Sequence, residues 1–360
     1  MRNDHTREGV VSVHAPDARP DATTEAEWRI RVTAASRLSF TLIDMNGECG
    51  RRNGMASLSL ARPEFRAVLE PASSFTLKTD APSALYAAEI TTLFQRLADQ
   101  WGSAPVDVKV ESGLPTHSGF GSKSTTLLAL GKAYAATCGR HEPTETLARV
   151  AERAGTSGGS VNLIDRGGFL VDGGHANPSD FDEEPRRYLV PSRVAGGGRK
   201  PPVLIHCAFP PWPILVILSE GFHIHGRSEG EWFEQVLPIP REEARKTAHL
   251  VLMNLAPAVA EGDYFAFCRA FKQLTYDTYF KGLQIARQSE AVQTLIKEAA
   301  VRPDIDAIGM SSMGPTCFAF TRRPRSAVAW LTELRQAGIV RDFWFTYSQN
   351  HPAVIEGLPA

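Results

Sequence analysis

The stretch that decides how this chain folds is Pro115-Thr116-His117-Ser118-Gly119-Phe120-Gly121-Ser122-Lys123-Ser124-Thr125-Thr126. Before it, valines alternate with charged residues over 106–111, which predicts a half-buried strand. After it, apolar residues recur at helical spacing as far as Gly139, a residue type that commonly ends helices. The stretch is therefore the loop of a strand–loop–helix unit. The free N–H groups and the dipole at the start of such a helix favour an anion.

The residue types in this loop suit a phosphate or diphosphate. Gly119 and Gly121 let the backbone approach a ligand closely and adopt positive φ. Lys123 adds a cation, and hydroxyl groups come from a set of three neighbours: Ser122, Ser124 and Thr125. The alternative is a glycine turn that only connects two elements, but such a turn requires fewer donors.

Spacing excludes two better-known phosphate loops. A Walker loop requires one glycine directly before the lysine and another five residues before that glycine, where this chain has Ser122 and His117. The dinucleotide pattern requires a third glycine where this chain has Ser124.

Composition narrows the class of protein. The chain has 360 residues, enough for two domains, and a formal charge of −1, which argues against nucleic acid as a partner. Its five cysteines show no C-x-x-C spacing and suggest reduced thiols. Residues 1–25 are polar and lack the apolar segment of a signal peptide, so we expect a disordered leader. No apolar run reaches membrane-spanning length, and we expect a cytoplasmic protein without a membrane partner.

Patterning predicts an α+β protein of two domains. The segment 180–200 is charged and then glycine-rich, which places a boundary between an N-terminal domain, 26–195, and a C-terminal domain, 201–360. The expected strands are 28–32, 38–45, 56–60, 106–111, 167–172, 203–207, 213–219, 305–308, 316–321 and 342–347. The expected helices are 85–101, 122–138, 144–154, 241–256, 262–275, 288–300 and 325–337. The ending of two strands, a helix and a strand suggests a split β-α-β arrangement.

Three separated motifs together resemble the GHMP kinase superfamily, the small-molecule kinases of galactose, homoserine, mevalonate and phosphomevalonate. The stretch 115–125 is similar to their central Pro-x3-Gly-Leu-Gly-Ser-Ser-Ala motif, with Phe120 for Leu and Lys123 for the second Ser. Residues 35–41 and 309–316 resemble the N-terminal and C-terminal motifs. The resemblance covers about residues 28 to 350. It implies a ribosomal-S5-like N-terminal domain, a ferredoxin-like C-terminal domain and a ligand between them.

One departure concerns the chemistry. In these kinases a carboxylate that assists deprotonation of the acceptor hydroxyl stands seven residues before a Gly-Gly pair. Counting back from Gly167 gives Ser160, and Asp165 lies too close to the pair to take that place. The chain therefore keeps a phosphate loop while lacking the kinase base.

Longer runs resemble a branch that does not phosphorylate, the β-ribofuranosylaminobenzene 5′-phosphate synthases. Residues 39–47 look like their H-x-T-L-I-D-L-N-G segment, and residues 166–175 look like their x-G-G-F-x-V-x-G-G-H segment. His225-Gly226, followed by Glu229 and Phe233, resembles a further stretch. That family joins phosphoribosyl pyrophosphate (PRPP) to the ring carbon of an aromatic acid, with loss of carbon dioxide and pyrophosphate.

A close relative is the C-nucleoside synthase of formycin and pyrazofurin biosynthesis, whose acceptor is an aminopyrazole dicarboxylate. Lys123 stands where the β-ribofuranosylaminobenzene 5′-phosphate synthases carry a small residue, and Ser39 replaces a histidine of those enzymes. Because a second substrate carboxylate calls for an added cation, we expect this antibiotic-pathway branch, with the benzoate-using synthase as the alternative. A homodimer is implied by the resemblance alone.

The resemblance and the residue types together give a candidate site. Arg37 would bind phosphate or carboxylate bidentately, with a surface ion pair as the alternative. The predicted catalytic residues are Lys123, Arg37 and His175. The predicted substrate-binding residues are Ser39, Thr41, His117, Gly119, Gly121, Ser122, Ser124, Thr125, His223, His225, Ser311 and Ser312.

Magnesium is the expected cofactor, because it would neutralise the departing pyrophosphate. Asp44 is the first candidate ligand, with Asp172 and Glu220 behind it. Asp44 could equally cap the turn at Asn46-Gly47. Two other functions remain open for the whole chain, an ATP-dependent small-molecule kinase and a ligand-binding protein without catalysis.

Overall fold

Two β-sheets organise the part of the chain that the computed structural model describes, residues 28–153, 158–190, 199–223 and 227–359. The larger sheet contains β1 (Arg29–Asp44), β2 (Arg51–Pro71), β3 (Thr76–Lys78), β4 (Val106–Ser112), β5 (Phe169–Asp172), β6 (His175–Ala176), β7 (Val203–Cys207) and β12 (Val354–Leu358). The smaller sheet, in the order β11-β8-β10-β9, contains β8 (Ile214–Ser219), β9 (Ala307–Met310), β10 (Thr316–Phe320) and β11 (Val340–Thr346). The α+β class is confirmed.

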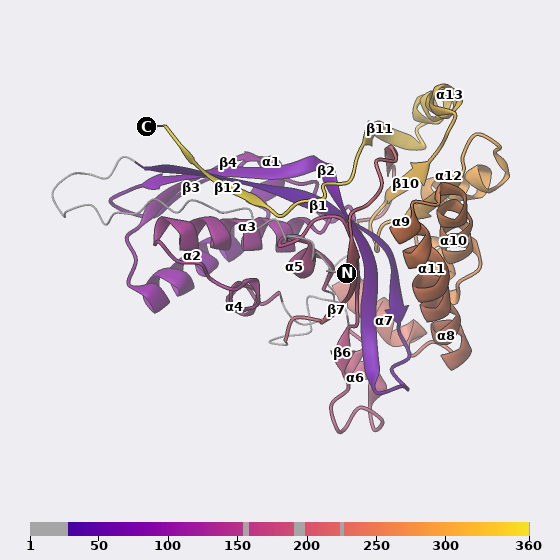
Figure 1. Cartoon of the computed structure of the whole chain (residues 1–360), viewed down its shortest axis with the longest axis horizontal. Coiled ribbons are helices and arrows are strands. Elements are labelled where there is room, and N and C mark those ends of the chain that lie inside the picture. Colours follow the sequence, from indigo (N-terminus) through magenta and orange to yellow (C-terminus); the bar gives the residue numbers. More distant parts are fainter. Residues whose placement is uncertain (1–27, 154–157, 191–198, 224–226, 360) are drawn as a thin grey trace, which may run out of the picture.

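Helices cover the sheets in two groups (Figure 1). The first group, on the left, contains α1 (Ala81–Ala84), α2 (Ala87–Trp101), α3 (Ser122–Thr137), α4 (Thr144–Val150) and α5 (Gly159–Leu163). The short helix α6 (Pro185–Tyr188) lies apart from this group, low in the view. The second group is α7 (Arg227–Val236), α8 (Arg241–His249), η1 (Leu250–Leu255), α9 (Ala256–Glu261), α10 (Tyr264–Tyr276), α11 (Tyr279–Ala286), α12 (Glu290–Val301) and α13 (Pro324–Gln336).

The hairpin of β1 and β2 connects the two groups. Its register shifts between Ala35 and Ser36 and again between Ser39 and Thr41. Such bulges bend a strand and strengthen its twist. In Figure 1 the two long strands accordingly turn from the left part of the molecule down through its middle. The bend carries the predicted N-terminal motif, residues 35–41, to the centre of the molecule.

One aromatic core binds the two groups of elements together. Phe40 of β1 is fully buried, and its ring centroid lies 5.0 Å from that of Phe271 on α10 and 5.2 Å from that of Phe318 on β10. Earlier along the same strand, Val32 and Ala34 belong to a neighbouring core that also contains side chains of α2 and α3. β1 therefore contributes to two cores, one before and one after the register shift at Ala35 and Ser36.

Most predicted elements are present, with instructive differences. The helix expected at 241–256 continues to Glu261 through a π-helical turn, η1. Pro257 follows that turn, and a proline lacks the N–H group for a regular helical bond, which accounts for the wider turn. The sequence patterns did not reveal α7 and α11.

The predicted boundary at residues 195–201 divides the chain but not the sheets. Strands β7 and β12 follow that boundary, yet β7 pairs with β5 and β12 pairs with β1, both within the larger sheet. Pairing between strands so distant in the chain leaves no local signal in a single sequence. The predicted leader, residues 1–25, lies outside the described residues.

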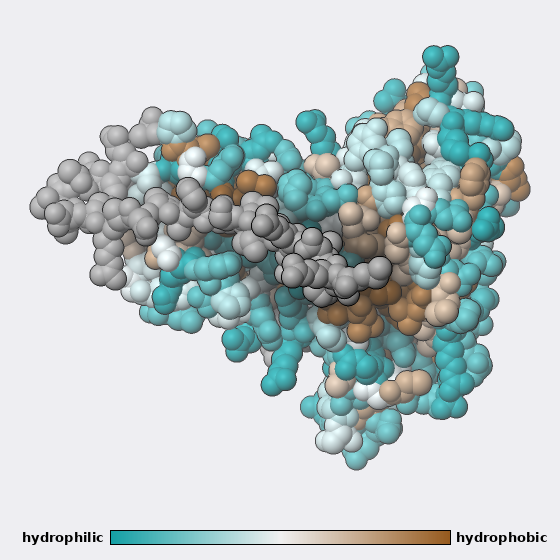
Figure 2. Space-filling model, viewed as in Figure 1, coloured by the Kyte–Doolittle hydropathy of each residue, from teal (hydrophilic) through white to brown (hydrophobic). Residues whose placement is uncertain are grey.

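Among the described helices, none combines the length and the apolar character needed to cross a bilayer. Figure 2 shows a face dominated by hydrophilic side chains, with apolar ones gathered near its centre, where Figure 1 shows β7 and α7.

Candidate functional site

The predicted phosphate loop connects β4 to α3, as expected. Gly119 has φ +99° and Gly121 has φ +70°, so both adopt conformations that other residues rarely reach. Gly121 is the N-cap residue of α3, and no side chain caps the first turn there. The N–H groups at the start of this 16-residue helix are thus free to bind an anion.

The C-terminal glycine motif packs directly on this loop. Ser311 donates its hydroxyl hydrogen to the carbonyl oxygen of Gly119 at 2.8 Å and accepts the N–H of Ser39 at 3.0 Å. A Cβ placed on Gly314 would lie 2.2 Å from the carbonyl carbon of Ser118, so only glycine fits. The three separated motifs therefore meet in space. Ser311, predicted to bind substrate, is fully buried and joins two of the motifs.

Arg37 of β1 lies against the same loop. Its backbone N–H donates to the carbonyl oxygen of Phe120 at 3.0 Å. An N–H group of its guanidinium donates a longer hydrogen bond, of 3.5 Å, to the carbonyl oxygen of Gly119. Its Nε atom is buried without a hydrogen-bond partner. The pKa of Arg37 is lowered to about 10, chiefly by burial and also by the nearby charge of Arg153, while the charge of Asp172 acts in the opposite direction. A cation held under such conditions favours an added anion.

The side chains at the start of α3 all contact neighbouring elements. Lys123 forms an ion pair with Glu89 of α2, with 2.6 Å between Nζ and Oε1. Ser124 accepts a hydrogen bond from Nε of Arg153 at 2.8 Å. Ser122 and Tyr86 share a hydrogen bond of 2.8 Å, and Thr125 is buried.

Arg153 and Glu229 are members of the site to which the sequence analysis gave no role. Burial lowers the pKa of Arg153, while the charges of Tyr86, Glu229 and Glu89 raise it. Glu229 comes from α7, and burial raises its pKa to about 7 against the influence of Arg153. Arg153 stands in no recognisable motif, and Glu229 belongs to a stretch that resembles the synthase family without indicating a role, so only the fold shows that they meet.

Ser160, which the sequence resemblance places where the kinases carry their base, lies on α5. Its hydroxyl is buried without a hydrogen-bond partner and lies 2.4 Å from the place that a Cβ of Gly121 would take. Asp165, the nearby carboxylate, pairs with Lys132 at 2.9 Å and accepts a hydrogen bond from Thr144. Asp165 is therefore already engaged by a lysine and a hydroxyl group in this structure.

Asp172 lies close enough to Arg37 for their charges to interact. Its Oδ1 atom accepts the N–H of Gly174 at 3.0 Å, and its Oδ2 atom is buried without a hydrogen-bond partner, 2.9 Å from the place that a Cβ of Gly158 would take. Burial raises the pKa of Asp172 to about 7, although the N–H groups of Gly174 and Gly158 and the charge of Arg37 lower it. Of the three predicted metal ligands, this is the one whose charge interacts with Arg37.

Asp44 has the alternative role that its sequence context left open. Its Oδ1 atom accepts the N–H groups of Asn46 and Gly47, both at 2.8 Å, and so caps the hairpin turn. It follows Arg37 by seven residues, roughly 20 Å of strand at about 3.3 Å per residue. His175 pairs with Arg52 near that same turn. Neither side chain belongs to the group around the phosphate loop.

The remaining predicted residues are distributed as follows. Nδ1 of His223 lies 3.3 Å from the carbonyl oxygen of His117, next to the phosphate loop. Thr41 is buried and donates to the carbonyl oxygen of Leu42, and Glu220 is exposed after β8. Ser312 adopts φ +55° in the C-terminal glycine loop. His225 lies outside the described residues.

Two further observations limit the chemistry. Within the described ranges, no three His, Cys, Asp or Glu side chains are grouped so that they could hold a metal ion.

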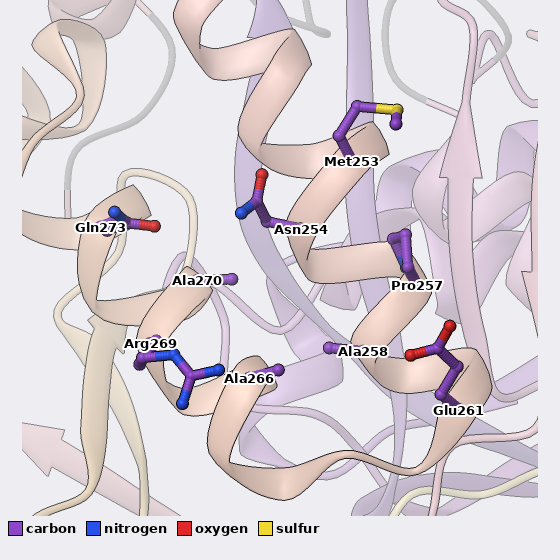
Figure 3. Close-up of a pocket in the computed structure, with 9 residues that line it drawn as sticks. All are labelled: Met253, Asn254, Pro257, Ala258, Glu261, Ala266, Arg269, Ala270 and Gln273. Atoms are coloured by element: carbon purple, nitrogen blue, oxygen red, sulfur yellow. The ribbon is translucent and has the colours of Figure 1, made fainter.

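A groove of about 330 Å³ lies between η1, α9 and α10 (Figure 3), bordered by residues such as Met253, Pro257 and Arg269. None of the predicted site residues lines it, and the loop cluster remains the candidate site.

Comparisons with known proteins agree with this site and fold. Residues 86–165, which include the phosphate loop, match the family model of the GHMP kinase N-terminal domain. The structure superposes on L. major mevalonate kinase with a TM-score of 0.63 and 12% identity, covering 89% of this chain and 96% of that one. For homoserine kinase from Cytophaga hutchinsonii the TM-score is 0.62 and the identity 13%, covering 94% and 100%. These likenesses confirm the GHMP kinase fold.

The similar sequences are not named as kinases. The β-ribofuranosylphenol 5′-phosphate synthase of Methanocaldococcus jannaschii is 32% identical over 298 residues, which cover 80% of this chain and 88% of that protein. The synthase of the same name from Archaeoglobus fulgidus is 32% identical over 292 residues, covering 81% and 88%. With this identity over nearly the full length of both relatives, the chain belongs to the β-ribofuranosylphenol 5′-phosphate synthase family.

Proposed function

We propose that this chain transfers a ribosyl 5-phosphate group from PRPP to a ring carbon of an aromatic acid, releasing carbon dioxide and pyrophosphate. The observation that carries the proposal is the composition of the site around Gly121. Arg37, Arg153 and the start of α3 supply positive charge there, and the side chain at the position of the kinase base is the neutral Ser160. Such a site suits anionic substrates and a reaction without a strong base.

The bonds of the reaction fit these groups. The bond between C1 of the ribose and the diphosphate oxygen breaks, and the diphosphate leaves with the electron pair. The ring carbon that bears the carboxylate bonds to C1, and the bond to the carboxylate carbon then breaks. Its electrons restore the aromatic ring, and carbon dioxide leaves. The ring carbon loses no proton, so a carboxylate base at position 160 is not required.

The residues of the site have distinct roles in this proposal. The N–H groups at the start of α3 bind the diphosphate, and Lys123 adds a positive charge that Glu89 shares in the structure. Gly119 and Gly121 allow the backbone to approach the ligand. Ser311 positions the loop by its hydrogen bond to Gly119.

Magnesium fits the site only as an ion held largely by the substrate. The described residues contain no cluster of three protein ligands, whereas Mg²⁺ commonly binds through one or two carboxylates together with substrate phosphates. The Oδ2 atom of Asp172, buried without a hydrogen-bond partner near Arg37, is the carboxylate oxygen that would hold it. When bound, the ion would neutralise charge on the departing diphosphate.

For the acceptor, two acids follow from different observations. The names of the relatives favour a hydroxybenzoate, because a phenol is their product. The presence of Lys123 and Ser39 in this sequence favours an aminopyrazole dicarboxylate, whose second carboxylate would need a cation. In the structure Lys123 is already paired with Glu89, which weakens that argument, so we place the hydroxybenzoate first.

The experiment is an incubation of the protein with Mg²⁺, PRPP and either 4-hydroxybenzoate or 4-aminopyrazole-3,5-dicarboxylate, followed by mass spectrometry. We expect a ribosylated product that has lost the mass of carbon dioxide, and the acid that gives it identifies the branch. A product that keeps the carboxylate would contradict the proposal. So would the absence of product from both acids together with ADP formation from ATP, which would indicate a kinase.

A further inference from the structure

Two hydrogen-bond donors lie unpaired beneath Gly121, and they approach it from different elements. The hydroxyl of Ser160 on α5 is 2.4 Å from the place of a Cβ at Gly121, and Nε of Arg37 on β1 is 3.1 Å from it. Both atoms are buried without a hydrogen-bond partner, and Ser160 is only 7% exposed. Leaving such groups unpaired is costly, so a polar site of this kind indicates a bound acceptor of hydrogen bonds.

The charges nearby indicate that this acceptor is an anion. Arg37 and Arg153 interact with each other and face two carboxyl groups, those of Asp172 and Glu229. The two positive and two negative formal charges of these four groups cancel one another. The partial positive charge at the N-terminus of α3 adds to that balance. That helix end then makes the space around Gly121 favourable for negative charge.

Resting on the proposed function, we infer that Ser160 and Arg37 form the subsite for the carboxylate of the acceptor acid, and that Ser160 determines the specificity for an acid. A carboxylate is flat, and it can take the Nε–H of a guanidinium and a hydroxyl hydrogen side by side. Glycine at position 121 keeps both donors clear of a side chain, because the hydroxyl lies 2.4 Å and Nε 3.1 Å from where a Cβ would stand. In this proposal the bulkier diphosphate binds along the first turn of α3 instead.

The same oxyanion chemistry could come from the diphosphate of the donor, and kinetics distinguish the two sources. Ser160→Asp would place a negative charge next to the bound carboxylate, while Ser160→Asn is matched in size without the charge. We expect Ser160→Asp to raise KM for the acid at least about a hundredfold over Ser160→Asn, because like charges at about 4 Å repel strongly in a partly buried site. KM for PRPP should change less than about threefold. Ser160→Ala, which removes one hydrogen bond to a charged group, should raise KM for the acid roughly tenfold.

Direct binding separates this inference from the proposed function. Titration calorimetry with 4-hydroxybenzoate and with the pyrazole dicarboxylate, each without PRPP, should show binding to the wild type and to Ser160→Asn, and a loss in Ser160→Asp. If binding follows this pattern while no acid is ribosylated, the subsite stands and the proposed reaction falls. If Ser160→Asp instead raises KM for PRPP, or does not differ from Ser160→Asn, the subsite is refuted, whatever the reaction.

Discussion

The contact between the two glycine loops can be tested by adding one methyl group. A Cβ on Gly119 would lie 2.4 Å from the carbonyl oxygen of Ser311 and 3.2 Å from its Cβ. The nearest atom belongs to the backbone, so it cannot turn aside as a side chain could. Gly119→Ala must therefore move the loops apart and break the 2.8 Å hydrogen bond from Ser311 to Gly119.

The size of the effect follows from three contributions. Positive φ costs a residue with a Cβ about 1–2 kcal/mol. The lost hydrogen bond contributes about 1 kcal/mol, and forcing a methyl group into a packed site about 1–3 kcal/mol. We therefore expect Gly119→Ala to lower the free energy of unfolding by about 4 kcal/mol. Gly139 provides a matched control, because it has φ +63° with nothing within 4 Å of its Cβ position. Gly139→Ala should cost only the strain, about 1 kcal/mol.

Urea unfolding of both variants, followed by circular dichroism, measures the difference. Turnover with PRPP and an acid measures its consequence, which should be a loss of at least about a hundredfold for Gly119→Ala, because misplacement by about 1 Å is sufficient for that. Equal stabilities of the two variants, or wild-type turnover in Gly119→Ala, would show that the loops do not depend on this contact.

Three further predictions concern single side chains. Burial lowers the pKa of Lys281 from 10.5 to about 7, so between these pH values the unfolded chain binds more protons and stability rises with pH. From pH 7.5 to 9.5 the unfolding free energy of the wild type should gain about 2 kcal/mol over Lys281→Met in urea titrations, and parallel pH profiles would contradict this. Phe40→Ala should cost about 4 kcal/mol by the same method, because Phe40 is enclosed by four aromatic rings; a loss under about 1 kcal/mol would argue against the shared core. Lys123→Ala should change the unfolding free energy by less than about 1 kcal/mol, since its ion pair is partly exposed, yet reduce turnover at least tenfold; retained turnover would remove Lys123 from the site.

Local signals in the sequence predicted the strand–loop–helix unit around residues 115–126 correctly. The alternation before it and the helical spacing after it depend on neighbouring residues alone, and β4 and α3 are present where they were expected. The meeting of the three motifs came from the resemblance, since no local rule brings Ser39 to Ser311 across 272 residues. The same limit applies to β12, whose pairing with β1 joins the two ends of the described chain.

The site was less predictable than the fold. Asp44 and Asp172 both looked like possible metal ligands, and only the structure shows that Asp44 caps a turn while Asp172 lies buried near Arg37. Arg153 reaches the site from a segment without any motif, through its hydrogen bond to Ser124. A side chain's reach depends on the path of the whole backbone, which residue spacing alone does not give.

The most direct test of the account is the fate of the acceptor's carboxylate. The protein is incubated with Mg²⁺ and an acceptor acid carrying ¹³C in the carboxylate on the reacting carbon, with and without PRPP, and the gas is analysed by mass spectrometry. The account predicts labelled carbon dioxide only when PRPP is present, in a one-to-one ratio with pyrophosphate. Pyrophosphate release while the label stays in the product would contradict the decarboxylating transfer to a ring carbon.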